Sequence, residues 1–164
     1  MIVVSDSTPL ITLMKAMRLD LLKGLYGEVI LPDAVFREVT TNVNFSDEAE
    51  LIKNSGFIKA VSVGDSSKVD YLQRVTGLDR GESEAIIYAD EVKADLLLMD
   101  EIAGRKVAQN MNIPMTGSLG VLIRAYQERL ISIDEADRAI SKIRSANRHI
   151  SEKLLQSALR QIHG

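Results

Sequence analysis

Four acidic side chains, from separate segments of the chain, have the types and positions needed to hold a divalent metal ion. Asp6 follows an apolar run at residues 1–4, and Asp100 ends a second run at residues 94–99. Such runs are typical of buried parallel strands, whose carboxyl ends meet where ligands bind. The other two acids stand in predicted helices: Glu38 and Glu82. Carboxylates gathered in one place repel each other unless a cation neutralises them, so the pattern predicts a metal-dependent phosphodiesterase.

The side chains available as ligands limit which metal ion the site can bind. The chain has no cysteine, and its two histidines, His149 and His163, both lie in the last 16 residues. Zinc sites built from cysteine and histidine therefore lack their ligands. Oxygen ligands favour Mg²⁺ or Mn²⁺, which we expect as the cofactor.

Each of these acids also has an ordinary structural explanation. Asp6 precedes Ser-Thr-Pro, so it can cap the next helix, and Asp100 can cap a helix in the same way. Glu38 stands beside the buried stripe marked by Val35 and Val39, where a surface glutamate is common. The metal-site hypothesis therefore depends on the acids acting together.

Two glutamates compete for the third position. Glu82 shares a helix face with the small and apolar side chains of Ala85, Ile86 and Ala89, whereas Glu84 lies about 200° away by helical geometry. An acid at the head of a core-facing stripe is hard to explain as solvation. Negative charge at a helix N-terminus is favourable for both. We predict Glu82 as the ligand, with Glu84 as the alternative.

Strands and helices alternate along the chain, which predicts a parallel sheet with right-handed crossovers. The predicted strands are residues 1–5, 28–31, 57–63, 95–99 and a short one near 113–115. The predicted helices lie at about 8–24, 33–41, from 46 to the glycine at 56, 66–75, 82–93, 101–111 and 117–128. Pro32 is expected to start a helix, and residues 77–81 are expected to form a turn. We divide the chain into one α/β domain at 1–131 and a helical hairpin at 132–164 packed on it, with a break at 147–151.

Composition narrows the protein class. A 46% hydrophobic content excludes a disordered chain, and no apolar run approaches the roughly 18 residues of a membrane span. The absence of cysteine fits a reducing cytosol, so we expect a cytoplasmic protein. Residues 138–164 carry six basic side chains and one acidic, a formal charge of +5, and the remainder carries −8. A basic segment beside an acidic site would suit the binding of a polyanion, provided that a metal ion lets the polyanion approach the carboxylates. A solvated helix face explains the basic charges equally well.

The motifs of the chain resemble those of PIN-domain proteins, and of VapC-like ribonucleases in particular. The similar subgroup carries GExxAI, an LxD motif with a following acid, GRxxA and GxLGxL, which stand here at residues 81–86, 98–101, 104–108 and 117–122. The opening residues 4–11 match the first acidic motif of the family. This resemblance covers residues 1 to about 131.

The resemblance implies a three-layer α/β/α PIN-like fold with a central parallel sheet, and a nuclease that cleaves RNA with Mg²⁺ or Mn²⁺. Carried over by position, the metal-binding and catalytic acids are Asp6, Glu38, Glu82 and Asp100, with Glu101 as an alternative beside Asp100. Many microbial members are toxins of toxin–antitoxin pairs, so we expect RNA, an antitoxin protein and a second copy of the chain as partners.

Four further side chains are candidates for substrate binding: Ser7, Arg105, Thr116 and Ser118. Ser7 and Ser118 are equally explained as helix caps, and Arg105 as an ion pair with Glu101 on a helix surface. Two rival functions stay open. A phosphoaspartate phosphatase would want a second Asp two residues after Asp6, where the chain has Thr8. A catalytically silent PIN-like module would bind RNA or protein without cleaving it.

Overall fold

The fold is a parallel β-sheet covered by helices. A computed structural model of the chain describes residues 1–42, 44, 46–146 and 150–164. The strands are β1 (Val3–Ser5), β2 (Val29–Pro32), β3 (Ile58–Val61), β4 (Leu96–Leu98) and β5 (Met115–Thr116). They form one five-stranded sheet in the order β3-β2-β1-β4-β5, and every pairing is parallel.

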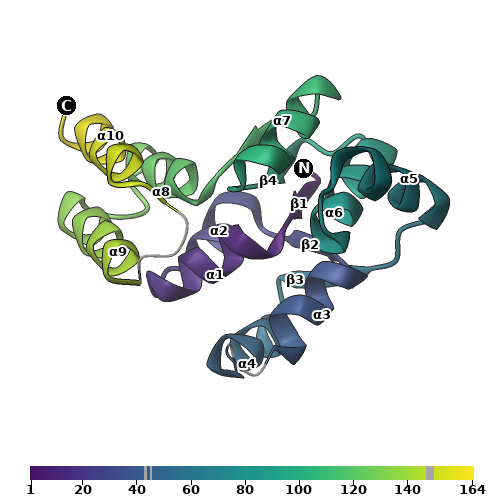
Figure 1. Cartoon of the computed structure of the whole chain (residues 1–164). Coiled ribbons are helices and arrows are strands. Elements are labelled where there is room, and N and C mark those ends of the chain that lie inside the picture. The colour runs from purple at the N-terminus through teal and green to yellow at the C-terminus, as the bar shows by residue number, and fades with distance from the viewer. Residues whose placement is uncertain (43, 45, 147–149) are drawn as a thin grey trace.

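Helices lie on both sides of this sheet. They are α1 (Ser7–Lys15), α2 (Asp20–Tyr26), α3 (Asp33–Thr41), α4 (Ser46–Asn54), α5 (Ser66–Thr76), α6 (Arg80–Glu91), α7 (Ile102–Asn110), α8 (Ser118–Gln127), α9 (Ile133–Ala146) and α10 (Glu152–His163). Helix α6 contacts the three central strands, with α5 beyond it, while α1, α2 and α8 lie on the other side (Figure 1). The predicted three-layer α/β/α fold is confirmed.

The strand order places a switch point between β1 and β4. From β1 the chain proceeds through β2 to β3 in one direction, and β4 and β5 extend the sheet in the other. Ser5 is paired with Leu98, and Leu98 with Thr116, so these three strands end side by side. Ligands of open α/β sheets bind in the crevice at such a point, which puts the residues after β1 and β4 at its entrance.

Several predicted boundaries shift for local reasons. The helical stretch predicted at 8–24 divides into α1 and α2, because Met17 takes a left-handed conformation with φ of 59°. Pro32 ends β2 and occupies the N-cap of α3, which spans residues 33–41 as predicted. The prediction of a turn through residue 81 was wrong, because Asp79 caps α6 and the helix begins at Arg80. The last strand lies at Met115–Thr116, not from residue 113.

The C-terminal helices α9 and α10 share the core of the domain. Their buried side chains include Ile140 and Ile143 on α9 and Leu155 and Ile162 on α10, all in the same apolar cluster as the strands. Helix α9 contacts α1 and α8, and α10 contacts α8 and α9 (Figure 1). Part of the predicted break at 147–151, residues 147–149, lies outside the described residues. Hairpin and sheet therefore belong to one packed unit.

Ion pairs join the two helices of this hairpin. Arg144 donates two hydrogen bonds to Glu152, of 3.0 and 2.9 Å, and His163 lies 2.7 Å from Asp137. One of the basic charges that suggested polyanion binding is thus already paired within the chain. Among the helices that the structure describes, none has the length and apolar character needed to cross a membrane.

Candidate active site

Asp6 is the most buried of the candidate acids. It follows β1 at the N-cap position of α1, yet its side chain makes no capping hydrogen bond with the helix. The residue is 2% exposed, and its Oδ1 atom has no hydrogen-bond partner among the described residues. Capping therefore does not account for this carboxylate. A buried carboxylate oxygen without a partner is costly, which is the situation a bound cation relieves.

Glu82 reaches the same region from the start of α6. Asp79 and Glu82 form a capping box: Asp79 Oδ1 accepts from the Glu82 amide at 2.8 Å, and Glu82 Oε2 accepts from the Asp79 amide at 3.0 Å. This reciprocal pair fixes the first turn of the helix. The Glu82 side chain is therefore held at the helix terminus, half-buried, with its second oxygen outside the capping box.

Glu84 has a structural role in the same helix. It is 5% exposed, its Oε1 accepts from the Ala34 amide at 3.0 Å, and its Oε2 accepts from Arg80 Nε at 2.9 Å. The first bond ties α6 to the first turn of α3, and the second is an i,i+4 pair within α6, so both oxygens have protein partners. These contacts explain why an acid stands at this position without any metal.

Glu38 approaches α6 from α3. The residue as a whole is exposed, but its carboxylate lies against Gly81, where an added Cβ would stand 3.0 Å from Glu38 Oε2. Partial shielding from water is the largest cause that raises the pKa of Glu38; the charge of Asp79 raises it further, and the Ser7 hydroxyl opposes the shift. The glycine before Glu82 therefore leaves room for a second carboxylate.

Asp100 lies across the switch point from Asp6. The N-cap of α7 is Glu101, not Asp100, and Asp100 Oδ1 instead accepts from the backbone amide of Ser118 at 2.7 Å. The other oxygen, Oδ2, is buried without a hydrogen-bond partner among the described residues. Asp100 is thus held against the N-terminus of α8, with one oxygen available to a ligand.

The pKa values of all four acids are raised, and in each case burial is the largest cause. For Asp6 the rise is large, and the charges of Glu82, Asp79 and Glu38 add to it, while the Ser7 amide opposes it. The charge of Glu101 raises the pKa of both Glu82 and Asp100. One electrostatic network therefore connects the acids, and a divalent cation would stabilise their ionised forms.

The acids fall into two groups. Asp6, Glu38 and Glu82 act on one another, whereas the charges that act on Asp100 are those of Glu101 and Arg105. Within residues 1–42, 44, 46–146 and 150–164, no three acidic or histidine side chains stand close enough to hold one metal ion together. All the candidate ligand atoms are carboxylate oxygens, and two of them, on Asp6 and Asp100, are buried without a partner among the described residues. Oxygen ligands of this kind are those that Mg²⁺ and Mn²⁺ prefer.

The four predicted substrate-binding residues lie around these acids. Ser7 is buried at the start of α1, and the amide of Ser118 holds Asp100. Arg105 donates from Nη1 to the carbonyl of Met99 at 2.8 Å and forms no ion pair with Glu101 in the described structure. Thr116 ends β5 and lines a groove beside Asp100.

Asp79 is a site residue that the sequence analysis did not single out. Its charge contributes to the raised pKa values of Asp6, Glu38 and Glu82. The signal was present in the sequence, because an aspartate three residues before a glutamate is the pattern of a capping box. It was missed because the turn was predicted to continue through residue 81, two residues beyond the N-cap at Asp79.

A comparison with known protein families identifies the chain. The family model described as PIN domain matches residues 2–164, so it extends through the C-terminal hairpin, beyond the stretch from residue 1 to about 131 that the sequence resemblance covered. No curated protein and no solved structure matches the chain. The chain therefore belongs to the PIN-domain family, whose members are generally nucleases.

Proposed function

We propose that the protein is a metal-dependent endoribonuclease, with Asp6, Glu38, Glu82 and Asp100 as its metal-binding and catalytic acids. The observation that carries this proposal is the state of Asp6: a carboxylate 2% exposed, with an unpartnered oxygen and with other acids raising its pKa. Among the described residues, no lysine or arginine is one of the groups that shift the pKa of Asp6. A side chain so placed costs folding free energy, and a cation ligand role accounts for that cost.

Different residues of the chain would position the metal ligands and bind the phosphate in such a reaction. The Ser118 amide orients Asp100, and the capping box orients Glu82, so both carboxylates are positioned before a substrate arrives. Arg105 stands beside Asp100 as a donor for a phosphate oxygen. A bound Mg²⁺ or Mn²⁺ would supply the activation of water and the neutralisation of phosphate charge.

We propose RNA as the substrate, and the toxin of a toxin–antitoxin pair as the biological role. Both follow from the resemblance to VapC-like ribonucleases in the motifs at 81–86, 98–101, 104–108 and 117–122. A toxin role predicts that expression of the intact chain arrests growth and that the Asp6→Asn variant does not. An antitoxin partner would be encoded in an adjacent open reading frame and would relieve the arrest.

A second candidate is a catalytically silent PIN-like module that binds RNA. The observation in its favour is that no three acids of the described residues stand within reach of one metal ion. Such a module would retain the fold and the groove beside Asp100, and would bind RNA equally well with and without a divalent cation.

Cleavage by matched variants separates the two candidates. Purified wild-type chain, Asp6→Asn and Asp47→Asn would be incubated with labelled RNA in Mg²⁺, in Mn²⁺ and in EDTA. Asp47 is the matched control, because it is an exposed aspartate in the first turn of α4. The nuclease proposal expects cleavage by wild type and Asp47→Asn in metal only, and none by Asp6→Asn. RNA binding without cleavage in any metal establishes the silent module, and undiminished cleavage by Asp6→Asn removes the proposed site.

A further inference from the structure

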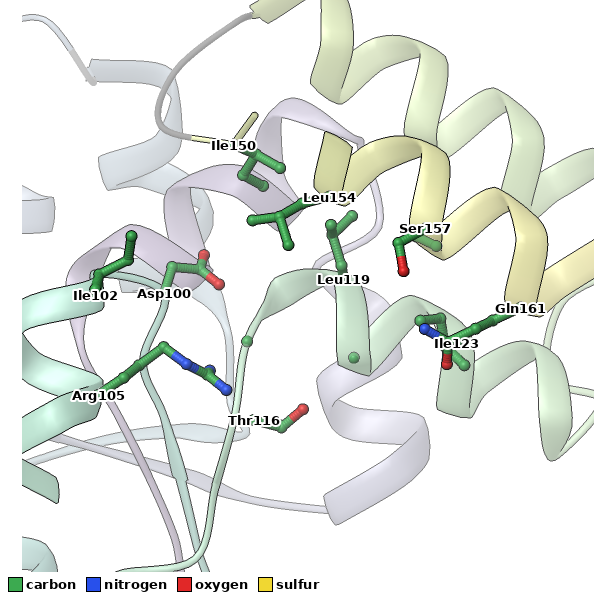
Figure 2. A pocket seen from close by; sticks show the side chains of 13 residues that line it. Asp100, Ile102, Arg105, Thr116, Leu119, Ile123, Ile150, Leu154, Ser157 and Gln161 are labelled. Atoms are coloured by element: carbon green, nitrogen blue, oxygen red, sulfur yellow. The ribbon is translucent and has the colours of Figure 1, made fainter. Parts of the chain in front are cut away.

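A groove opens directly beside Asp100, and the C-terminal hairpin forms one of its walls. Its volume is about 520 Å³, within the range of ligand pockets. Its walls are contributed by the start of α7, the segment from β5 into α8, and α10. Figure 2 shows Asp100 and Arg105 on one side of the opening, and Ser157 and Gln161 on the other. The groove is therefore continuous with the candidate active site.

The chemistry of the groove changes along its length. Asp100 and Arg105 are the only charged residues among the described residues that line it, and both stand at the same end. Leu119, on α8, and Leu154, on α10, form apolar walls between the two ends (Figure 2). Ser157 and Gln161 supply a hydroxyl and an amide at the other end. A ligand that fits is charged at one end, flat or apolar in the middle and rich in hydrogen-bonding groups beyond.

We propose that this groove binds the sugar and base of the nucleotide next to the phosphate that is cleaved. The inference rests on the proposed nuclease function, because it takes the phosphate to lie at Asp100 and Arg105. The base then packs between Leu119 and Leu154, and its edge meets Ser157 and Gln161. Single-stranded RNA is recognised through such unstacked bases, read on their hydrogen-bonding edges.

Charge complementarity favours a nucleotide over a second copy of the chain. The guanidinium of Arg105 uses Nη1 on Met99 O, and the described structure gives its other nitrogens no acceptor, so they remain for a phosphate. Leu154 is 52% exposed although it stands beside a buried neighbour in the core, Leu155. Its apolar surface is the part of the wall that a bound base would cover. Docking of a second copy would cover the same leucine without requiring the charged end.

The binding experiment uses probes with and without a base. Wild-type chain in Mg²⁺ would be titrated by calorimetry with the four nucleoside 5′- and 3′-monophosphates, and with ribose 5-phosphate. The groove predicts that at least one nucleotide binds about tenfold or more tightly than ribose 5-phosphate, since the base buries apolar surface against the leucines. Equal binding of nucleotides and ribose 5-phosphate would overturn the inference.

Two leucines of nearly equal exposure provide a matched pair of variants. Leu154 is 52% exposed on α10, and Leu51 is 51% exposed on α4, which lies away from the hairpin in Figure 1. Leu154→Ala should weaken nucleotide binding about five- to tenfold and leave ribose 5-phosphate unchanged, whereas Leu51→Ala should change neither. Gln161→Ala should alter the order of preference among the four bases. Identical behaviour of the two leucine variants would contradict a base site at Leu154.

A separate cleavage assay distinguishes failure of this inference from failure of the proposed function. Base-dependent nucleotide binding without any RNA cleavage would refute the nuclease function. If that binding is also the same with and without a divalent cation, the protein is a silent RNA-binding module. Cleavage that is equal in wild type, Leu154→Ala and Leu51→Ala at subsaturating RNA would refute the base site alone. Sedimentation of the same variants tests the second copy: a dimer that Leu154→Ala dissociates, without any change in nucleotide binding, assigns the groove to self-association.

Discussion

The carboxylate of Asp100 occupies the space where a side chain at position 117 would begin. An ideal Cβ on Gly117 would stand 2.5 Å from Asp100 Oδ1, the atom that accepts the Ser118 amide hydrogen bond. The backbone of Gly117 is extended, with φ of −107°, so any residue could adopt its conformation. Position 117 therefore requires glycine because a larger residue would leave no space for the Asp100 carboxylate.

Gly117→Ala should displace Asp100 while the chain remains folded. Loss of the Ser118 hydrogen bond would misplace one carboxylate, and disturbing a positioned ligand lowers metal affinity about 10- to 100-fold. Titration with Mn²⁺ by calorimetry measures this directly. Gly56→Ala is the control, because nothing lies within 4 Å of an added Cβ there. If both variants bind Mn²⁺ as wild type does, Asp100 is not a ligand.

Replacing Glu82 and Glu84 should have separable effects. Glu82→Gln keeps an oxygen that can accept from the Asp79 amide but loses its charge, so we expect Mn²⁺ affinity and cleavage to fall with little loss of stability. Glu84→Gln loses the charge paired with Arg80, which should cost about 1–2 kcal/mol of unfolding free energy and leave Mn²⁺ affinity near wild type. Chemical denaturation and calorimetry on both variants measure the two quantities. The opposite pattern would make Glu84 the ligand.

The stability of the metal-free protein should depend on the ionisation of Asp6. Its folded-state pKa lies well above the ordinary value of 3.8, because of burial first and then of nearby acids. The folded state therefore keeps this proton to higher pH than the unfolded state does. Its contribution is fully present below pH 3.8 and is lost as pH rises through the folded-state pKa. In EDTA, Asp6→Asn should be more stable than wild type at neutral pH, and Mg²⁺ should reduce the difference.

Asp65 provides a control of opposite sign. Hydrogen bonds, above all from the Ser67 side chain, lower its pKa, so its contribution is present above the ordinary value and is lost as pH falls through the folded-state pKa. Asp65→Asn should therefore lower stability at neutral pH, where Asp6→Asn raises it. Thermal denaturation from about pH 2 to about pH 8 covers both pH windows and measures both effects. Parallel curves for wild type and Asp6→Asn would show that the Asp6 carboxyl has an ordinary pKa.

The hairpin should behave as part of the core in unfolding. Ile140, on α9, is 1% exposed, so Ile140→Ala should cost about 2–5 kcal/mol and lower the stability of the whole domain in a single transition. Ile102→Ala is the matched control: the same deletion at a residue 79% exposed should cost under about 0.5 kcal/mol. Denaturant unfolding followed by circular dichroism checks both. A separate early transition in Ile140→Ala would instead show that the hairpin unfolds by itself.

Much of the fold could be predicted because the strands are short apolar runs separated by amphipathic helices. Residues 1–4 and 94–99 are such runs, and the alternation of strands and helices predicts a parallel sheet, but it does not predict that these two strands are neighbours in it. The exact boundaries could not be predicted. Met17 adopts a left-handed conformation after α1, and no glycine or proline in the sequence indicates a helix end there. Asp79 caps α6, so this helix begins before the glycine at position 81, where the turn was predicted to end.

The candidate site could be predicted in its residues but not in its contacts. Strand ends indicated Asp6 and Asp100, because a parallel sheet brings its carboxyl ends to one edge. The sequence did not show that Glu84 would be used by Arg80 and the Ala34 amide, since position 34 is fifty residues away in the chain. Nor did it show that α10 would form a wall beside Asp100, because packing of helices distant in sequence leaves no local pattern.

The glycines of the motifs have a consequence for the evolutionary history of such chains. At positions 81, 104 and 117 an added Cβ would meet, respectively, Glu38 Oε2, Met99 Sδ and Asp100 Oδ1, at 3.0, 2.6 and 2.5 Å. Two of these glycines make room for acids of the candidate site, while Gly104 makes room for a core methionine. A lineage that loses catalysis no longer needs the space that Gly81 and Gly117 leave for the acids. It still needs the space that Gly104 leaves for Met99. Descendants without activity should therefore vary at positions 81 and 117 and keep glycine at 104, so the three positions together record whether selection still acts on chemistry or on folding alone.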